Sequence, residues 1–435
     1  MAVPILIILA VMAAAYAAAK TRGLSVELSM FASAVAGGLA GAFLKTPPLG
    51  ELGRHLAEGA FTYLDVILVF FTATLFMAIV DGSGGINYAV RATIRVFARR
   101  RVAALLVLMV IVLIPGALTG AGSVSLLVVG TPVALALGRL GVPKKRAAAI
   151  LFILAGLSAA APPVNIWAMI LCAGTAIPYV GFELVLGIPC LVLGTFTVLL
   201  LGWKREPAPA GSPAELPEVP AGMTWWRVLI PFAVFFGLVV ATRVWPFSTP
   251  ILGLALEFTA AGAAALLLSP RRLPFLSLAL ETVRRLLPLL STMVIVGMLQ
   301  QVMTATGVRG LLSYALISTP LLLLFILLPV VIPVSEGVLT YGGAAIIGIP
   351  LIWFLDSLGY HATVVIAGLS LLWPLGDGLP PTALIGRLSN MVSGYRGSYW
   401  GFLRSTWLPW LVITAAGMLM IIFSSKLAFL VRWSM

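Results

Sequence analysis

Helix-breaking residues recur at a fixed offset in this chain. The stretch from Pro115 to Pro163 has a counterpart from Pro333 to Pro381, 218 residues later and without a gap. Gly-x-Pro and Pro-Pro breaks coincide in the two copies. Because proline and glycine interrupt helices, repeated breaks inside apolar segments indicate a binding site that discontinuous helices form near the middle of a bilayer.

The composition requires a membrane. Of the 435 residues, 61% are apolar and only 9% are charged, so we predict an all-α polytopic membrane protein. The net charge of +13 could suggest nucleic acid, but the Lys and Arg residues gather in short loops. This distribution indicates that the basic residues set the orientation of the spans in the cell (inner) membrane, and it argues against nucleic-acid binding.

The N-terminus is similar to a signal peptide, but its charges are in the wrong order. No basic residue precedes the apolar run 3–19, whereas Lys20 and Arg22 follow it. A cleaved signal has its basic region first. We therefore expect a retained span with its N-terminus outside.

The first repeat is predicted to occupy residues 1–203. Basic residues flank its central stretch on both sides, and the 37 residues between Arg101 and Arg139 are few for two full spans. We therefore predict a re-entrant hairpin there, with its tip buried in protein or facing a water-filled site. The predicted elements are spans at 3–19, 25–45 and 60–80, an amphipathic surface helix at 84–101, the hairpin at about 102–138, a broken span at about 146–174 and a span at 183–202.

A Pro- and Ala-rich stretch at 204–224 is predicted to be a cytoplasmic linker. Three spans then precede the second hairpin, so this hairpin should enter from outside, and 225–435 should be an inverted repeat with the C-terminus outside. Lys426 and Arg432 in that external tail do not fit the charge rule. The predicted elements are spans at about 225–243, 250–268 and 286–304, a hairpin at about 321–357, a broken span at about 362–395 and a final span at about 405–425.

The hairpin tips and the breaks supply the candidate site. The first tip has hydroxyls and free backbone N–H groups at the start of a half-helix, which suits an anionic group; a small-residue packing seam is the alternative. Unwound carbonyls at the breaks could coordinate Na⁺, or the prolines could simply kink the helices. The candidate substrate ligands are Thr119, Gly120, Gly122, Ser123, Ser125, Asn165, Thr340, Thr382 and Arg387. The candidate Na⁺ ligands are Gly120, Ser123, Ser158, Pro162, Ser335, Glu336, Gly337, Asp377, Gly378 and Pro380.

Three of these candidates are charged residues within the membrane region, where charge is costly and usually functional. Glu336 and Asp377 leave either Na⁺ or H⁺ coupling open. Arg387 could bind a substrate carboxylate, neutralise Asp377, or lie at the cytoplasmic surface.

The order Gly120-Ala-Gly-Ser-Val-Ser, Gly130-Thr-Pro and Ala161-Pro-Pro resembles the large membrane subunit of TRAP transporters, within the wider ion-transporter superfamily. The resemblance implies an elevator-type carrier that moves an organic anion, commonly a carboxylate, with Na⁺. It also implies a small membrane subunit and an extracytoplasmic solute-binding protein as partners. Val164 stands where the family has a Ser, and Asp377 and Arg387 depart from its pattern.

Two other functions are considered. A stand-alone carboxylate carrier of the same superfamily would need no binding protein. An intramembrane aspartyl protease would use Asp377 with Asp65, although the surrounding motif matches that class poorly. No phosphate-binding Walker motif occurs, so ATP hydrolysis by this chain is not expected, and no cofactor is predicted.

Overall fold

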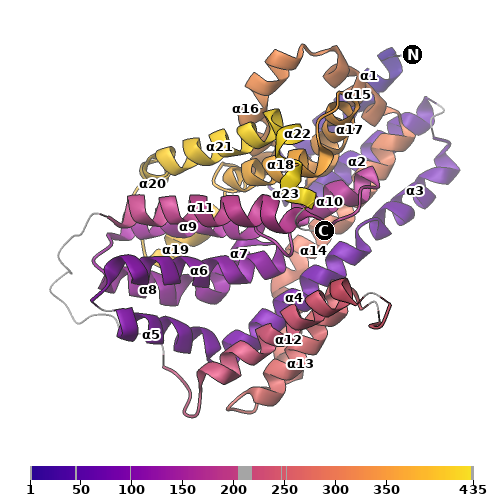
Figure 1. The fold of residues 1–435 in the computed structure, drawn as a ribbon. Helices are drawn as coiled ribbons and strands as arrows, with labels where there is room; N and C mark the ends of the chain where they lie inside the picture. Colours follow the sequence, from indigo (N-terminus) through magenta and orange to yellow (C-terminus); the bar gives the residue numbers. More distant parts are fainter. Residues whose placement is uncertain are drawn as a thin grey trace.

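The computed structural model describes residues 2–44, 47–97, 99–203, 218–245, 247–250 and 252–432. These residues fold into α-helices and two π-helical segments, with no strand among them (Figure 1). Nine helices in the described part are long and apolar enough to cross a membrane. The prediction of an all-α polytopic membrane protein is confirmed. Residues 204–217 of the predicted linker lie outside the described residues.

Seven helices, here called the peripheral unit, come from the first part of each half. α14 packs against α2, α3 and α4, and α13 packs against α4 and α12. Gly59 and Gly297 let α3 and α14 touch, since a Cβ on Gly59 would lie 2.5 Å from the Cα of Met298. The unit consists of α1 (Ala2–Thr21), α2 (Val26–Phe43), α3 (Leu49–Phe61), α4 (Leu64–Gly82), α12 (Trp225–Val244), α13 (Gly253–Leu268) and α14 (Phe275–Ala305).

The remaining helical segments, apart from α5 and α15, form what we call the central unit. Its first-copy members are α6 (Arg101–Thr119), α7 (Gly122–Ser125), η1 (Leu126–Gly130), α8 (Thr131–Arg139), α9 (Lys144–Ala160), α10 (Ile166–Thr175) and α11 (Phe182–Gly202). Its second-copy members are α16 (Leu321–Leu339), η2 (Ala344–Gly348), α17 (Ile349–Ser357), α18 (Ala362–Gly376), α19 (Leu384–Ser393), α20 (Tyr399–Ser405), α21 (Trp407–Ile422), α22 (Ser424–Leu427) and α23 (Phe429–Arg432). The π-helical segments η1 and η2 lie 218 residues apart, as the Pro-Pro pairs do.

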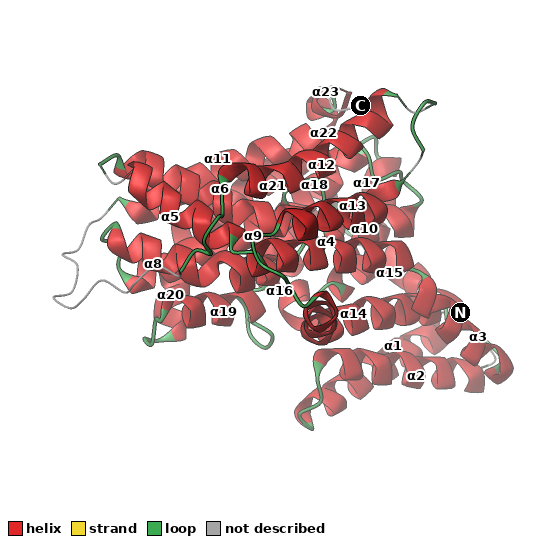
Figure 2. Ribbon diagram, turned by 90° about the horizontal axis from the view of Figure 1, so that it is seen from below, coloured by secondary structure: helices red, strands yellow, loops and turns green. Residues whose placement is uncertain are grey.

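Two short helices join the units, α5 (Gly85–Phe97) and α15 (Val308–Ser318). Their contacts correspond in the two halves. α5 packs on α4, α8 and α12, and α15 packs on α14, α17 and α1. Both views place α5 and α8 at one end of the molecule and α15 and α17 at the other (Figures 1 and 2).

The two copies interlock inside the central unit. α10 of the first copy contacts η2 and α17 of the second, and α19 of the second contacts η1 and α8 of the first. α9 and α18 pack together, and every residue of Ala147–Ala160 and of Thr363–Gly376 is buried. These broken helices are therefore the core of the unit.

Several predicted elements have different bounds. The third span, predicted at 60–80, is preceded by a helix that was not predicted, α3, because its charged residues lower the hydropathy of that stretch. α14 begins at Phe275, whereas the matching span was predicted to begin at about 286. α15 was not predicted. Arg309 is its one charged residue, so it lacks the row of basic residues that marked the surface helix at 84–101. The final span, predicted at about 405–425, divides into α20 and α21 with a bend of 55°.

Each arm of the first hairpin is itself long and apolar enough to count as a candidate span. The length of this stretch therefore fits two spans as well as a re-entrant hairpin. Burial is the better evidence, because the whole tip from Leu118 to Leu126 is enclosed by protein.

Candidate functional site

The tip of the first hairpin is a buried turn of small and hydroxyl residues. α6 ends at Thr119 and is capped by Gly120, whose φ of 70° lies in the left-handed region that glycine adopts without cost. A Cβ at Gly120 would lie 3.1 Å from both the Ile166 N and the Val164 Cγ1. Glycine is therefore required here by both conformation and space.

The hydroxyl groups of the first tip differ in whether they donate a hydrogen bond to the protein. Thr119 donates to the Pro115 carbonyl at 2.7 Å, and Ser125 donates to the Val112 carbonyl at 2.6 Å. No hydrogen bond joins the Ser123 hydroxyl to any described residue, and its side chain is buried. Ser123 is thus the tip hydroxyl with the most freedom to bind a ligand.

The first break lies directly against this tip. The Pro162-Pro163 peptide is cis, and the N–H of the next residue, Val164, donates to the Ala117 carbonyl at 3.0 Å. Asn165 begins α10 as its N-cap, since its Oδ1 accepts from the Ala168 N–H at 2.9 Å. Its Nδ2 donates to the Ala160 carbonyl at 2.9 Å, so this one amide spans the gap between the half-helices.

The second break repeats the backbone arrangement. Pro380-Pro381 is also cis, and Thr382 donates its N–H at 3.3 Å and its hydroxyl at 2.9 Å to the Gly337 carbonyl. Ala383 follows with a φ of 46°. In both copies, the residue after the prolines is thus bonded to the end of the hairpin's first helix.

Two buried carboxylates distinguish the second copy. Glu336 is 1% exposed and accepts from the Trp167 Nε1 of the first copy at 3.0 Å. Asp377 is 7% exposed and follows Gly376, where a Cβ would lie 2.6 Å from the Glu336 Cβ. The two acids therefore lie on adjoining segments, and within the described ranges neither takes part in an ion pair.

Unpaired buried carboxylates normally require a cation or a proton. Among the described residues, no group of three or more His, Cys, Asp and Glu side chains gathers in a way that could hold a metal ion. A Na⁺ site here would therefore depend on carbonyl and hydroxyl oxygens together with these acids.

Other predicted residues lie at the edge of the site. Ser335 is buried and accepts from the Trp373 Nε1 at 3.4 Å. Thr340 caps the C-terminal end of α16 with a φ of 52° and is half-buried. Arg387 is exposed, donates to the Pro381 carbonyl at 3.3 Å and forms no ion pair with Asp377 in the described part. The remaining members, Ser158, Gly122, Gly337 and Gly378, are buried, Pro162 is half-buried and Pro380 is exposed.

Sequence reasoning missed four aromatic residues that surround the centre. Trp167 and Trp373 donate to Glu336 and Ser335 as described above. The Tyr179 hydroxyl donates to the Pro163 carbonyl at 3.1 Å and accepts from the Asn165 N–H at 3.0 Å, and the Tyr399 hydroxyl donates to the Gly378 carbonyl at 2.7 Å. Each tyrosine follows the second half of a broken helix, Tyr179 after α10 and Tyr399 after α19. This shared position in the two copies could have marked both residues as candidates.

This geometry defines a class of protein, an all-helical membrane protein built around two copies of a hairpin and a broken helix. In particular, the structure is similar to the YdaH transporter of Alcanivorax borkumensis, which is described as having an unusual topology. The TM-score is 0.58 at 14% identity, and the match covers 85% of this chain and 87% of that chain. No protein-family model and no curated protein matches the sequence. The likeness establishes the fold, while membership of the TRAP family stays a prediction.

Proposed function

We propose that this chain is the carrier of a secondary active transporter that imports an organic anion, a carboxylate, together with Na⁺. The proposal is carried by one observation, namely that each hairpin end packs on the Pro-Pro break of its own copy while the two copies touch beside these ends. The contacts between the copies are those of Gly122 with Ile385 and of Trp167 with Glu336. Broken helices place free peptide groups and helix ends where a regular helix would have none.

The first copy would supply the anion-binding groups. Its tip and break carry hydroxyls, an amide and the N-terminal end of the return arm, without any acidic side chain. The partial positive charge at such a helix end favours a carboxylate.

The second copy would supply the cation-binding groups. Glu336 and Asp377 are buried without a cationic partner in the described structure. A bound Na⁺ would offset the cost of burying their charge. Protonation would offset it too, so H⁺ coupling is the alternative for the same pair.

An elevator movement is supported by the division into two units. The central unit contains the whole candidate centre, and α5 and α15 join it to the peripheral unit. A cavity of about 250 Å³ lies between the units beside the first tip, lined by Thr74, Asp81, Val124, Leu127, Glu281 and Arg285 among others. Such a cavity would give the centre a path to one side of the membrane.

The inverted arrangement is also part of the proposal. α8 lies at the same end of the molecule as α5, away from the N-terminus (Figures 1 and 2). The basic residues next to α5 and α8, Arg99, Arg100, Arg139, Lys144 and Lys145, favour a cytoplasmic location for that end. Both chain termini would then be external.

The finer identity is a TRAP-type large subunit that works with a small membrane subunit and a solute-binding protein. A stand-alone carrier is the second candidate, because the fold covers most of a chain that is itself described as a transporter. The protease hypothesis gains no support, since Asp65 is exposed at the start of α4 while Asp377 is buried beside Glu336.

The test is uptake into proteoliposomes that contain the purified chain. A panel of labelled mono- and dicarboxylic acids would be offered with a Na⁺ gradient or a pH gradient imposed separately, and without or with the membrane extract of the source cells and its soluble binding proteins. Uptake driven by a Na⁺ gradient supports the proposal. Uptake by the chain alone would favour the stand-alone carrier over the TRAP type, and no gradient-driven uptake in any arm would reject both.

A further inference from the structure

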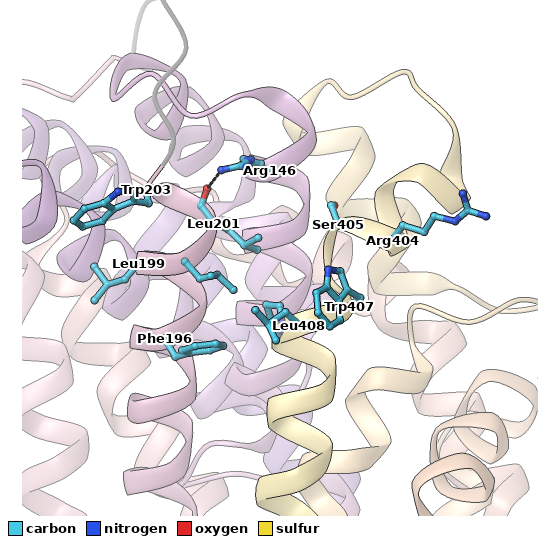
Figure 3. A pocket seen from close by; sticks show the side chains of 11 residues that line it. Arg146, Phe196, Leu199, Leu201, Trp203, Arg404, Ser405, Trp407 and Leu408 are labelled. Carbon is cyan, nitrogen blue, oxygen red and sulfur yellow. Dashed lines mark hydrogen bonds between the residues drawn. The ribbon is translucent and has the colours of Figure 1, made fainter.

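A groove unconnected with the proposed transport centre lies between α11 and α21. It has a volume of about 770 Å³ and is lined mainly by apolar side chains, with Phe196 and Leu199 on one wall and Trp407 and Leu408 on the other (Figure 3). Arg146 lies at its upper end, where it donates to the Leu201 carbonyl at 3.4 Å (Figure 3). The walls suit a hydrocarbon chain.

A second groove of about 560 Å³ lies on the other side of the bend between α20 and α21. It shares Arg404 and Trp407 with the first and adds Trp400, Leu403 and Trp410 among its lining residues. Two apolar grooves on either side of one tryptophan match the two acyl chains of a phospholipid.

The charge around the bend is positive. Arg404 forms no ion pair or hydrogen bond with any residue of the described ranges. One bond to Leu201 engages Arg146, which leaves most of the five guanidinium N–H groups available. The Lys145 Nζ lies 3.9 Å from where a Cβ on Gly401 would stand. Among the described residues that line the two grooves, none is acidic.

Trp203 and Trp407 are mostly exposed at this same end of the groove. Tryptophan in this position is typical of the headgroup level of a bilayer, and basic pockets between membrane helices hold anionic lipid headgroups. The apolar walls, the aromatic rim and the cationic end therefore occur in the order that a phospholipid presents them.

We propose that the bend between α20 and α21 is a binding site for one anionic phospholipid. Its headgroup phosphate would lie between Arg146 and Arg404 near Ser405, and one acyl chain would enter each groove. The headgroup end of this surface, at Arg146 and Arg404, lies outside the hairpin tips and the breaks, whereas Leu379 of the second break is among the residues that line the second groove. The headgroup contacts therefore do not depend on the transported substrate.

The experiment measures phosphatidylglycerol binding to the purified full chain by native mass spectrometry, with zwitterionic phosphatidylcholine, whose net charge is zero, as the comparison. The variants are Arg146→Gln, Arg404→Gln and the pair. The control is Arg99→Gln with Arg100→Gln, which removes two exposed arginines at the same end of the molecule but outside both grooves. We expect the dissociation constant for phosphatidylglycerol to rise about fivefold for each groove arginine, and about 25-fold for the pair.

Binding of phosphatidylcholine, which has the same phosphate but no net charge, should weaken less than that of phosphatidylglycerol in each groove variant. Equal effects of the groove pair and the control pair would overturn the site, as would unchanged phosphatidylglycerol binding in the groove pair. If Arg146→Gln does not fold, Arg404→Gln alone decides the matter, because that side chain is exposed and makes no structural bond. A groove filled instead by a second copy of the chain would show as a dimer weakened by the variants, with lipid binding unchanged, and this too would overturn the proposal.

Discussion

The two copies of the broken-helix motif have the same backbone plan and different chemistry. Both have a cis Pro-Pro pair, a π-helical segment in the return arm, and a bond from the residue after the prolines to the hairpin. The second copy places Glu336 and Asp377 where the first has Leu118 and Ala159. The comparison shows that the backbone geometry is duplicated, whereas the side chains differ. We therefore assign anion binding to the first copy and cation binding to the second.

The close contact between hairpin and broken helix is also made in opposite ways. In the first copy, Gly116 on the hairpin faces Ser158, whose Cβ would lie 2.6 Å from an added Cβ. In the second copy, Gly376 occupies the position equivalent to Ser158 and faces Glu336. One small residue therefore suffices for each contact, on either partner.

The largest expected effect tests the division of charge. Glu336→Gln removes the charge but keeps an oxygen for the Trp167 N–H, so the protein should fold while Na⁺-driven uptake falls about 10- to 100-fold, because a charged partner contributes about 1.5–3 kcal/mol. Initial rates in proteoliposomes measure this. The matched change in the first copy, Leu118→Met, should leave the rate within about twofold. Similar rates for the two variants would contradict a cation site in the second copy.

The next effect concerns packing at the second contact. Gly376→Ala should destabilise the protein by about 1–3 kcal/mol, because the added methyl group would lie 2.1 Å from the Pro333 carbonyl oxygen, which belongs to the backbone, and 2.6 Å from the Glu336 Cβ. A thermal melt in detergent, with Gly138→Ala as a control that meets no atom within 4 Å, measures the loss.

The equivalent contact in the first copy, between Gly116 and Ser158, can be tested in the same thermal melt. Gly116→Ala combined with Ser158→Gly should be milder than Gly116→Ala alone, since the obstacle is then removed. If the double variant is no better than the single one, the two contacts are not equivalent.

A smaller effect separates the two breaks. Asn165→Ala removes an N-cap and a bond to Ala160, and should destabilise by about 1–2 kcal/mol. Thr382→Val keeps the shape and removes one bond to Gly337, so its loss should be about 1 kcal/mol. Chemical denaturation of the two variants checks the order, and a greater loss for Thr382→Val would reverse our view of which side chain stabilises its break more.

The smallest effect uses backbone conformation alone. Ala383→Gly should stabilise by about 0.5–1 kcal/mol, because alanine is strained at a φ of 46° and glycine is not. Ala263→Gly, at an exposed position inside α13, should instead destabilise by about 1 kcal/mol. Melting temperatures that move in the same direction for both variants would disprove the strained conformation.

Much of the site was predictable because the breaks are encoded locally. Proline cannot continue a helix, so Pro162 and Pro380 mark the interruptions without any tertiary information. The partners of the candidate residues could not be predicted, because Trp167 reaches Glu336 across 169 residues and Tyr399 reaches Gly378 from a separate helix. Arg387 is the clearest example, since its spacing from Pro381 left three roles open and the structure shows an exposed side chain on the break carbonyl.

The sequence by itself determined that this protein is a helical membrane protein with two matched sets of interrupted helices. Apolar residues and prolines influence the local structure within a few residues of their own position, so their effects can be predicted from the sequence. Only the tertiary structure decided that α10 packs on the second hairpin and α19 on the first, and that two acids with no cation beside them in the described structure lie at their junction. Such contacts join residues far apart in the chain, and they depend on how all the helices share one limited interior.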